Sequence, residues 1–302
     1  MSWRSASLAF LLALIGVELA TRALFKDTAV LFPSFQTAHA YGPVKLRGLR
    51  PKARFRHTSP EGSWTFAANS KGFRDREHST VDVLCLGDSN TLGYEVGQDD
   101  PYPAVLERES GLTVLNAGVA GFGTAEALAL LEHEGFKYRP KVVTLGFSEN
   151  DLADNARRDW TPGIRVLDII HGIPGTAWLS QRSYFYSLLL NDAWKFFRTP
   201  RPLEPVDQTS LAAELILRMH RLCKERGVRF ILIDIPTFNG PYRSRPALPD
   251  ALRARLKGVE IVDSRALFGR LQGKELHRRR GHQHLSELAH AVIGAELTRR
   301  LR

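Results

Sequence analysis

The stretch VDVLCLGDSNT, residues 81–91, decides the fold class, because an apolar run ends there on a glycine and a group of polar residues. Residues 81–86 are mostly apolar and partly β-branched, which is typical of a strand buried in a parallel sheet. Gly87 permits a tight turn, and a serine on a strand-to-helix turn exposes its hydroxyl at the end of the sheet. Taken alone, Ser89 could equally be the cap of the next helix.

Strands and helices alternate from this point to the end of the chain. Four further strand-like runs lie at residues 113–115, 141–147, 229–235 and 259–262. Helical patterns lie at residues 125–134, at 210–226 and after Ser286. The alternation predicts an α/β fold with a doubly wound, mainly parallel sheet. Residues 156–205 break the rhythm and predict an insertion near the carboxyl edge of the sheet, where sites form in such folds.

The N-terminus carries an uncharged apolar run, SASLAFLLALIGV, at residues 5–17. This run is short for a full membrane span and has the length of a signal-peptide core, but no clean cleavage site follows it. We therefore expect residues 1–25 to form an uncleaved signal anchor or transmembrane segment; a cleaved signal or an ordinary packing helix are the alternatives. Residues 26–80, with several prolines and glycines, predict an irregular N-terminal extension with short strands before a domain at 81–302.

Composition narrows the class of protein. The 302 residues are 43% hydrophobic and 25% charged, as in a globular protein with a substantial core, and the net charge is +10. Such a charge favours anionic surfaces, but we see no run of aromatic residues interleaved with Lys or Arg that would suggest stacking on bases, so we expect no nucleic-acid partner. Two cysteines, Cys85 and Cys223, are too few for a disulfide framework or a zinc site and are expected to be buried hydrophobes.

Three more polar segments follow separate predicted strands or precede the last helix. The glycines of NAGVAGFGT, residues 116–124, let backbone N–H groups approach a ligand, although a flexible loop explains them too. Asn150 supplies an amide suited to a developing oxyanion, or simply an Asx turn. His284 could deprotonate Ser89, or be an idle surface histidine.

In this combination and order the sequence resembles the SGNH/GDSL hydrolases, specifically bacterial members with an N-terminal anchor. The resemblance covers residues 64–300 and rests on NSKGFR, GDSNTLG, LNAGVAGFGT, SENDLADN and HLSELAH. It implies a flavodoxin-like three-layer α/β/α sandwich with Ser89 as nucleophile and His284 as general base. It also implies an oxyanion hole made by the Ser89 N–H, the Gly121 N–H and the Asn150 side chain.

Residues beside these motifs are candidates for support of the site. They are Asp88, Asp151 and His282. The pair His282 and His284 could also suggest a metal site, but no acidic or cysteine partner is nearby in the sequence. We expect neither a metal nor a cofactor.

One departure from the family concerns the triad acid. The family usually has an aspartate two or three residues before the histidine, where this chain has His282 and Gly281 after an arginine triplet. The possible solutions are a Ser–His dyad, loss of activity, or an acid from elsewhere, such as Glu149, Glu275 or Glu287. For a dyad, an aspartate introduced at 281 or 282 is expected to raise turnover. The triplet, Arg278 to Arg280, is either a solvated loop or a holder of an anionic substrate.

The expected function is a serine esterase or O-deacylase acting on a small acyl ester of a glycan or lipid at a membrane. The catalytic domain is expected outside the cytoplasm, in the periplasm. Acyl transfer through the same site is the nearest variant. A non-catalytic glycan- or lipid-binding module on a decayed hydrolase fold, and a cytosolic thioesterase with a packed N-terminal helix, are the rivals.

Overall fold

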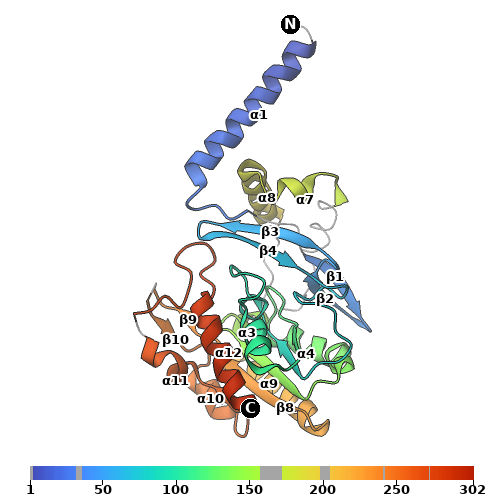
Figure 1. The fold of residues 1–302 in the computed structure, drawn as a ribbon, viewed down its shortest axis with the longest axis vertical. Coiled ribbons are helices and arrows are strands. Elements are labelled where there is room, and N and C mark those ends of the chain that lie inside the picture. The colour runs from blue at the N-terminus through green and yellow to red at the C-terminus, as the bar shows by residue number, and fades with distance from the viewer. Residues whose placement is uncertain (1–2, 32–35, 157–171, 198–204, 241, 272) are drawn as a thin grey trace.

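A five-stranded parallel sheet forms the centre of the protein (Figure 1). The structure, a computed structural model, describes residues 3–31, 36–156, 172–197, 205–240, 242–271 and 273–302. The strands, in sheet order, are β11 (Glu260–Val262), β8 (Arg229–Asp234), β7 (Val142–Phe147), β5 (Val83–Leu86) and β6 (Val114–Asn116). Chain order reverses between β5 and β7, which is the flavodoxin-like arrangement, so the predicted fold class is confirmed.

Helices cover both faces of this sheet because side chains along each strand alternate in direction. On one face, Leu84 and Leu86 join a core with α4 (Thr124–His133) and α9 (Gln208–Glu225). On the other face, Val83 and Cys85 join a core with three helices: α3 (Tyr102–Ser110), α11 (Ser264–Phe268) and α12 (Glu287–Leu301). The result is a three-layer α/β/α sandwich. Both cysteines are free and fully buried, as expected.

Short elements connect the layers. They are α2 (Ser89–Leu92), η1 (Gly135–Tyr138), α5 (Asp151–Asp154), β9 (Thr237–Phe238), β10 (Ser244–Arg245), α10 (Asp250–Arg255) and η2 (Gly269–Leu271). The part of the predicted insertion that the structure describes contains α7 (Thr176–Leu179) and α8 (Tyr184–Phe197). Residues 157–171 and 198–204 of that insertion lie outside the described residues.

The segment predicted as an irregular extension is more regular than expected. It forms two antiparallel hairpins, β1 (Gln36–Tyr41) with β2 (Val44–Leu49) and β3 (Arg54–Ser59) with β4 (Gly62–Ala67). Phe55 and Phe66, on the inner side of β3 and β4, are buried and pack edge to face. This packing explains why the chain stays extended here although its prolines and glycines suggested irregular structure.

The N-terminal helix α1 (Trp3–Phe25) projects away from the sandwich (Figure 1). None of its residues is buried. Its most apolar stretch of 18 residues has a mean hydropathy of 2.0, so length and composition allow the helix to cross a membrane. A packing helix of a soluble core would have a buried stripe, which α1 does not have.

Candidate active site

The turn between β5 and α2 presents Ser89. The Asp88 side chain caps α2 by accepting a hydrogen bond from the Asn90 N–H at 2.8 Å, so Ser89 itself is not the cap. Gly87 has φ +149°, and a Cβ at this position would lie 2.2 Å from Oγ1 of Thr91. Only glycine fits that turn, and the turn leaves the Ser89 hydroxyl at the carboxyl end of the sheet.

His284 reaches the serine from the loop before α12. Its Nε2 lies 2.8 Å from the Ser89 Oγ, although 195 positions separate the two residues in the chain. Ser286, two residues later, caps α12 through its side chain, and the neighbouring Leu285 is fully buried. Leu285 and Ser286 therefore anchor this loop to the protein, and the imidazole of His284 points at the Ser89 hydroxyl.

An acid that the sequence analysis missed lies on the other side of the imidazole. Oε2 of Glu95 is 3.5 Å from Nδ1 of His284, and the Glu95 side chain is fully buried. Burial alone would raise the pKa of this carboxyl, but the imidazoles of His284 and His57, at 3.5 and 4.0 Å from its oxygens, outweigh the effect of burial. The pKa consequently lies well below its usual value, and Glu95 is a carboxylate at neutral pH.

The loop that carries Glu95 is held by Arg74. The buried Arg74 guanidinium donates to the carbonyls of Leu92, Gly93, Val96 and Gly97. Glu95 itself has φ +65°, a left-handed conformation that a non-glycine residue adopts only when its surroundings hold it there. The NSKGFR motif therefore acts through its arginine, which fixes the backbone on both sides of this acid.

A cleft of about 260 Å³ opens beside the Ser89 hydroxyl. It is lined by Asp88, Ser89, Asn90, Ser148, Glu149, Asn150, Ile235, Pro236, Thr237, Phe238, His277, His282, Gln283 and His284. Residues 88–90, 148–150 and 235–238 of this lining follow the carboxyl ends of β5, β7 and β8, at the place where the strand order reverses, and the histidines come from the segment before α12. The position is the one at which open α/β sheets bind ligands.

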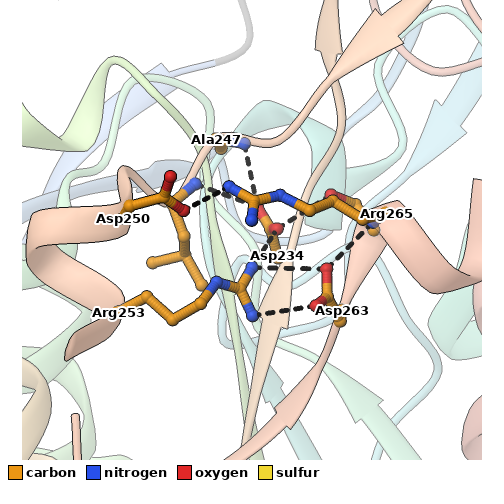
Figure 2. A network of polar contacts seen from close by, with 8 residues as sticks. Asp234, Ala247, Asp250, Arg253, Asp263 and Arg265 are labelled. Atoms are coloured by element: carbon orange, nitrogen blue, oxygen red, sulfur yellow. Dashed lines mark hydrogen bonds and ion pairs between the residues drawn. The ribbon is translucent and has the colours of Figure 1, made fainter.

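One wall of the cleft, residues 235–238, depends on a buried polar network (Figure 2). Asp234, at the end of β8, accepts hydrogen bonds from the Ala247 N–H at 2.8 Å and from the Arg253 guanidinium at 2.9 Å. Asp263 binds the same guanidinium at 3.1 Å. These contacts fix the chain on either side of the wall, so Asp234 has a structural role although it is a buried carboxyl.

The predicted oxyanion donors are only partly brought together. Ser89 and Asn150 both line the cleft, whereas Gly121 is not among the described lining residues. One N–H of the Asn150 amide donates to Asp154 at 2.8 Å, which leaves the other for a ligand. Gly121 has φ +80°, and its carbonyl accepts from the guanidinium of Arg47.

The three supporting candidates lie around the cleft in different ways. Asp88 is the buried cap of α2, and burial raises its pKa. Asp151 is buried behind Asn150 and accepts from Oγ1 of Thr124 at 2.9 Å; burial and then the charge of Asp88 raise its pKa well above the usual value. His282 is exposed at the rim, and its backbone N–H lies 3.4 Å from Oε1 of Glu95.

The three acids expected as replacements for the family aspartate do not contact His284. Glu149 pairs with Arg245 at 2.6 Å, and Glu275 pairs with Arg279 at 2.9 Å. Glu287 pairs with Arg278. These three acids were only candidates under one of the alternatives, and in the structure each of them pairs with an arginine.

The arginine triplet is likewise engaged elsewhere. Arg278 donates to the Glu95 carbonyl, and Arg280 pairs with Asp27 at 3.5 Å. In the part of the chain that the structure describes, none of the residues that line the cleft is an arginine. Within the described ranges, no group of three or more His, Cys, Asp or Glu side chains is arranged to hold a metal ion.

The signal that could have identified Glu95 is a local one. The acid is the second residue after GDSNTLG and stands between Tyr94 and Val96, in a segment otherwise without charge. A carboxylate in apolar surroundings is buried only with a partner. Its partner, however, is 189 positions away, and the sequence alone does not show that contact.

The chain is similar to several known proteins. Residues 85–292 match the GDSL-like lipase/acylhydrolase family. A lipase/acylhydrolase from Enterococcus faecalis is similar in structure, at 17% identity and a TM-score of 0.44 over 72% of this chain and 94% of that one. A GDSL-like lipase from Bacteroides thetaiotaomicron VPI-5482 has 13% identity and a TM-score of 0.41, over 73% and 88% of the two chains. A search of curated protein sequences gave no match.

Proposed function

The chain belongs to the GDSL-like lipase/acylhydrolase family, and we propose that it hydrolyses acyl esters with Ser89, His284 and Glu95 as its catalytic triad. The observation that carries this proposal is the 2.8 Å contact between Oγ of Ser89 and Nε2 of His284 at the wall of a cleft. A nucleophile in hydrogen-bond reach of a base, with a third group that orients the base, is the arrangement used in covalent acyl transfer.

The reaction proceeds in two steps. Ser89 Oγ attacks the acyl carbon while Nε2 of His284 takes its proton, and the new oxyanion accepts hydrogen bonds from the Ser89 N–H and the Asn150 amide. His284 returns the proton to the leaving alkoxide, and an acyl-serine forms. Water, deprotonated by the same imidazole, then attacks the acyl carbon; the bond to Oγ breaks, the imidazolium returns the proton to Oγ of Ser89, and the acid leaves. The negative charge of Glu95 stabilises the imidazolium during both steps.

The predicted Gly121 donor stays a proposal. Its left-handed backbone and the Arg47 contact on its carbonyl fix the direction of the neighbouring peptide groups. Asn150 has a free amide N–H in the cleft itself and is the better supported donor.

A short acyl group fits the cleft best. The volume of about 260 Å³ lies below the range of about 300–1,000 Å³ that is usual for drug-sized ligands. An acetyl ester on a glycan or a lipid headgroup has an acyl part of this size. We therefore propose O-deacylation, with the alcohol part of the substrate outside the cleft.

The site supports an enzyme over a decayed binding module. The reason to consider a decayed fold was the absence of an acid before His284. Glu95 supplies a buried carboxylate at 3.5 Å from Nδ1, so each part of a triad is present.

We further propose that α1 anchors the protein in a membrane, with the catalytic domain outside the cytoplasm. The helix has 23 residues and no buried side chain. Arg280, in the loop that carries His284, pairs with Asp27, two residues beyond the end of α1. The site then lies on the side of the domain that faces the membrane.

The proposal is tested by the hydrolysis of p-nitrophenyl acetate and p-nitrophenyl octanoate by the full-length protein in detergent. Wild type should hydrolyse the acetate faster than the octanoate. Ser89→Ala and His284→Ala should each lose activity by about 10⁴-fold or more, as in serine proteases that lose a triad member. Ser148→Ala, which removes a neighbouring hydroxyl of the cleft, should retain most of the wild-type activity. Wild-type turnover in Ser89→Ala would refute the assignment.

A further inference from the structure

Helix α8 packs beside the last third of α1, and α7 lies next to α8 (Figure 1). Glu18 of α1 accepts hydrogen bonds from the hydroxyl of Ser183 at 2.7 Å and from the backbone N–H groups of Tyr184 and Phe185 at 3.0 and 3.1 Å. These groups belong to the beginning of α8, so a single carboxylate satisfies donors that the helix itself leaves free.

A second contact strengthens the same junction. The guanidinium of Arg22, one turn after Glu18 on α1, donates to the carbonyl of Arg182 at 3.0 Å. It also lies over the Tyr184 ring, 5.0 Å from its centroid. The only two charged side chains between Ser5 and Phe25 are therefore both engaged by the segment around α8.

The outer face of this helix pair is apolar. On α8, Ser187 and Leu190 are buried, whereas Phe185 and Leu189, on the opposite face, are 37% and 56% exposed. Trp178 of α7 is 58% exposed as well. A surface helix of a soluble domain normally turns its polar face to water, so the orientation is the reverse of the usual one.

A groove continues this apolar face onto α1. It measures about 670 Å³, and its apolar lining comes from both sides: Leu11, Leu14, Ile15 and Leu19 from α1, and Trp178, Leu179 and Phe185 from the helix pair. The groove is open and long enough along α1 for a flexible hydrocarbon chain.

The position along α1 indicates what covers this surface. Glu18 lies about 22 Å from the Trp3 end of the helix, at about 1.5 Å per residue. A hydrocarbon core of about 30 Å therefore places Glu18 and Arg22 in its last third and at its boundary. At that depth Glu18 has no water as a partner, and α8 supplies its hydrogen-bond donors instead. The aromatic and arginine side chains around Glu18 are of the kinds found at membrane interfaces.

We propose that α7 and α8 lie in the membrane interface beside α1, with Trp178, Phe185 and Leu189 in contact with lipid and an acyl chain of a bilayer lipid in the groove. This inference rests on the proposed membrane anchoring by α1. It gives the enzyme a second membrane contact, which restrains the rotation of the domain about the anchor. Because the His284 loop contacts the chain just after α1, the cleft is then held at a constant height above the bilayer.

The test uses single-cysteine labels on the full-length protein in phosphatidylcholine vesicles. Cys85 and Cys223 are fully buried, so a polarity-sensitive fluorophore labels an introduced cysteine selectively. The labelled variants are Phe185→Cys and Leu189→Cys for the helix pair and Leu12→Cys for α1, with Lys257→Cys as the aqueous control. Each is measured with and without spin-labelled lipid as a quencher.

We expect blue-shifted emission, and its loss with the spin-labelled lipid, at 185, 189 and 12 but not at 257. If the label at 12 reports a lipid environment and the labels at 185 and 189 report water, the anchor is supported but the inference is overturned. Water at all four positions would instead refute the anchoring itself. Blue-shifted emission at 185 and 189 that spin-labelled lipid does not quench means that protein covers the face, and this also overturns the inference.

Discussion

Glu95 is the residue on which the catalytic proposal depends most. In the proposed triad it replaces the aspartate that the family usually has in the histidine loop, and it comes from the loop after α2. Its carboxylate lies 3.5 Å from Nδ1 of His284, although the two residues belong to different loops. A carboxylate that orients the imidazole does not have to come from one particular loop.

The first prediction concerns this acid. Glu95→Gln should lower kcat for p-nitrophenyl acetate by about 10⁴-fold, because a neutral amide neither stabilises the imidazolium nor keeps the correct tautomer. Glu149→Gln is the matched control, since Glu149 also lines the cleft but pairs with Arg245. Circular dichroism checks that both variants are folded. Equal losses in the two variants would remove Glu95 from the triad.

The second prediction corrects an expectation from the sequence. An aspartate at 281 was expected to raise turnover, but Gly281 has φ +69°, and a Cβ there would lie 2.4 Å from Oε1 of Glu95. Gly281→Asp should therefore lower kcat, because it strains the loop and places a second carboxylate against Glu95. Steady-state kinetics on the acetate ester measures this, and an increase in kcat would mean that Glu95 does not serve His284.

At the scale of elements, the central strands could be predicted and the loops between them could not. The strand predicted at 113–115 begins and ends one residue before β6, and the strand predicted at 229–235 ends one residue after β8. Buried parallel strands are apolar throughout, so sequence shows them directly. The contact between Glu95 and His284 joins two loops, and no local pattern encodes it. Short strands were expected before β5, but their pairing into two hairpins was not, since cross-strand packing such as that of Phe55 on Phe66 holds them.

The third prediction concerns the loop that carries Glu95. Arg74→Met should destabilise the protein by about 3 kcal/mol or more, because four buried carbonyls lose their donor. It should also lower kcat more than it raises KM, since the acid is displaced but the cleft lining is not.

The matched control for this variant is Arg76→Met. The Arg76 side chain is 64% exposed, and it pairs with Glu107 on the surface, a contact worth at most about 1 kcal/mol. Denaturant unfolding and steady-state kinetics are measured on both. If Arg74→Met kept wild-type kcat, the Arg74 contacts would not be needed to position Glu95.

At the scale of the whole molecule, buried histidines make stability depend on pH. Burial lowers the pKa of His290 to about 3, and it also lowers the pKa of His57 and of His277. An unfolded histidine titrates near 6.5. Below that pH the unfolded chain binds protons at these histidines and the folded chain does not, so the free energy of unfolding decreases as pH falls.

The fourth prediction follows from this sign. The free energy of unfolding should decrease from about pH 6.5 downward, by about 1.4 kcal/mol per pH unit for each such histidine. His290→Asn should make the slope shallower by about the contribution of one histidine, because it removes one titrating group. The asparagine side-chain oxygen can still accept a hydrogen bond from the Tyr102 N–H, as Nδ1 of His290 does at 3.2 Å, so the fold is kept. Denaturant unfolding between pH 4 and pH 8 tests it. A slope that is identical in wild type and His290→Asn would show that His290 is protonated in the folded protein.

The measurement that tests the catalytic proposal most directly is covalent labelling by a fluorophosphonate, with the site of modification located by peptide mass spectrometry. The reagent reacts with a serine only when a base activates it. We predict a single adduct on Ser89 in wild type, no adduct in Ser89→Ala, and labelling of Glu95→Gln at the same serine but much more slowly. An adduct that persists in Ser89→Ala, or labelling of wild type no faster than of His284→Ala, would contradict the triad.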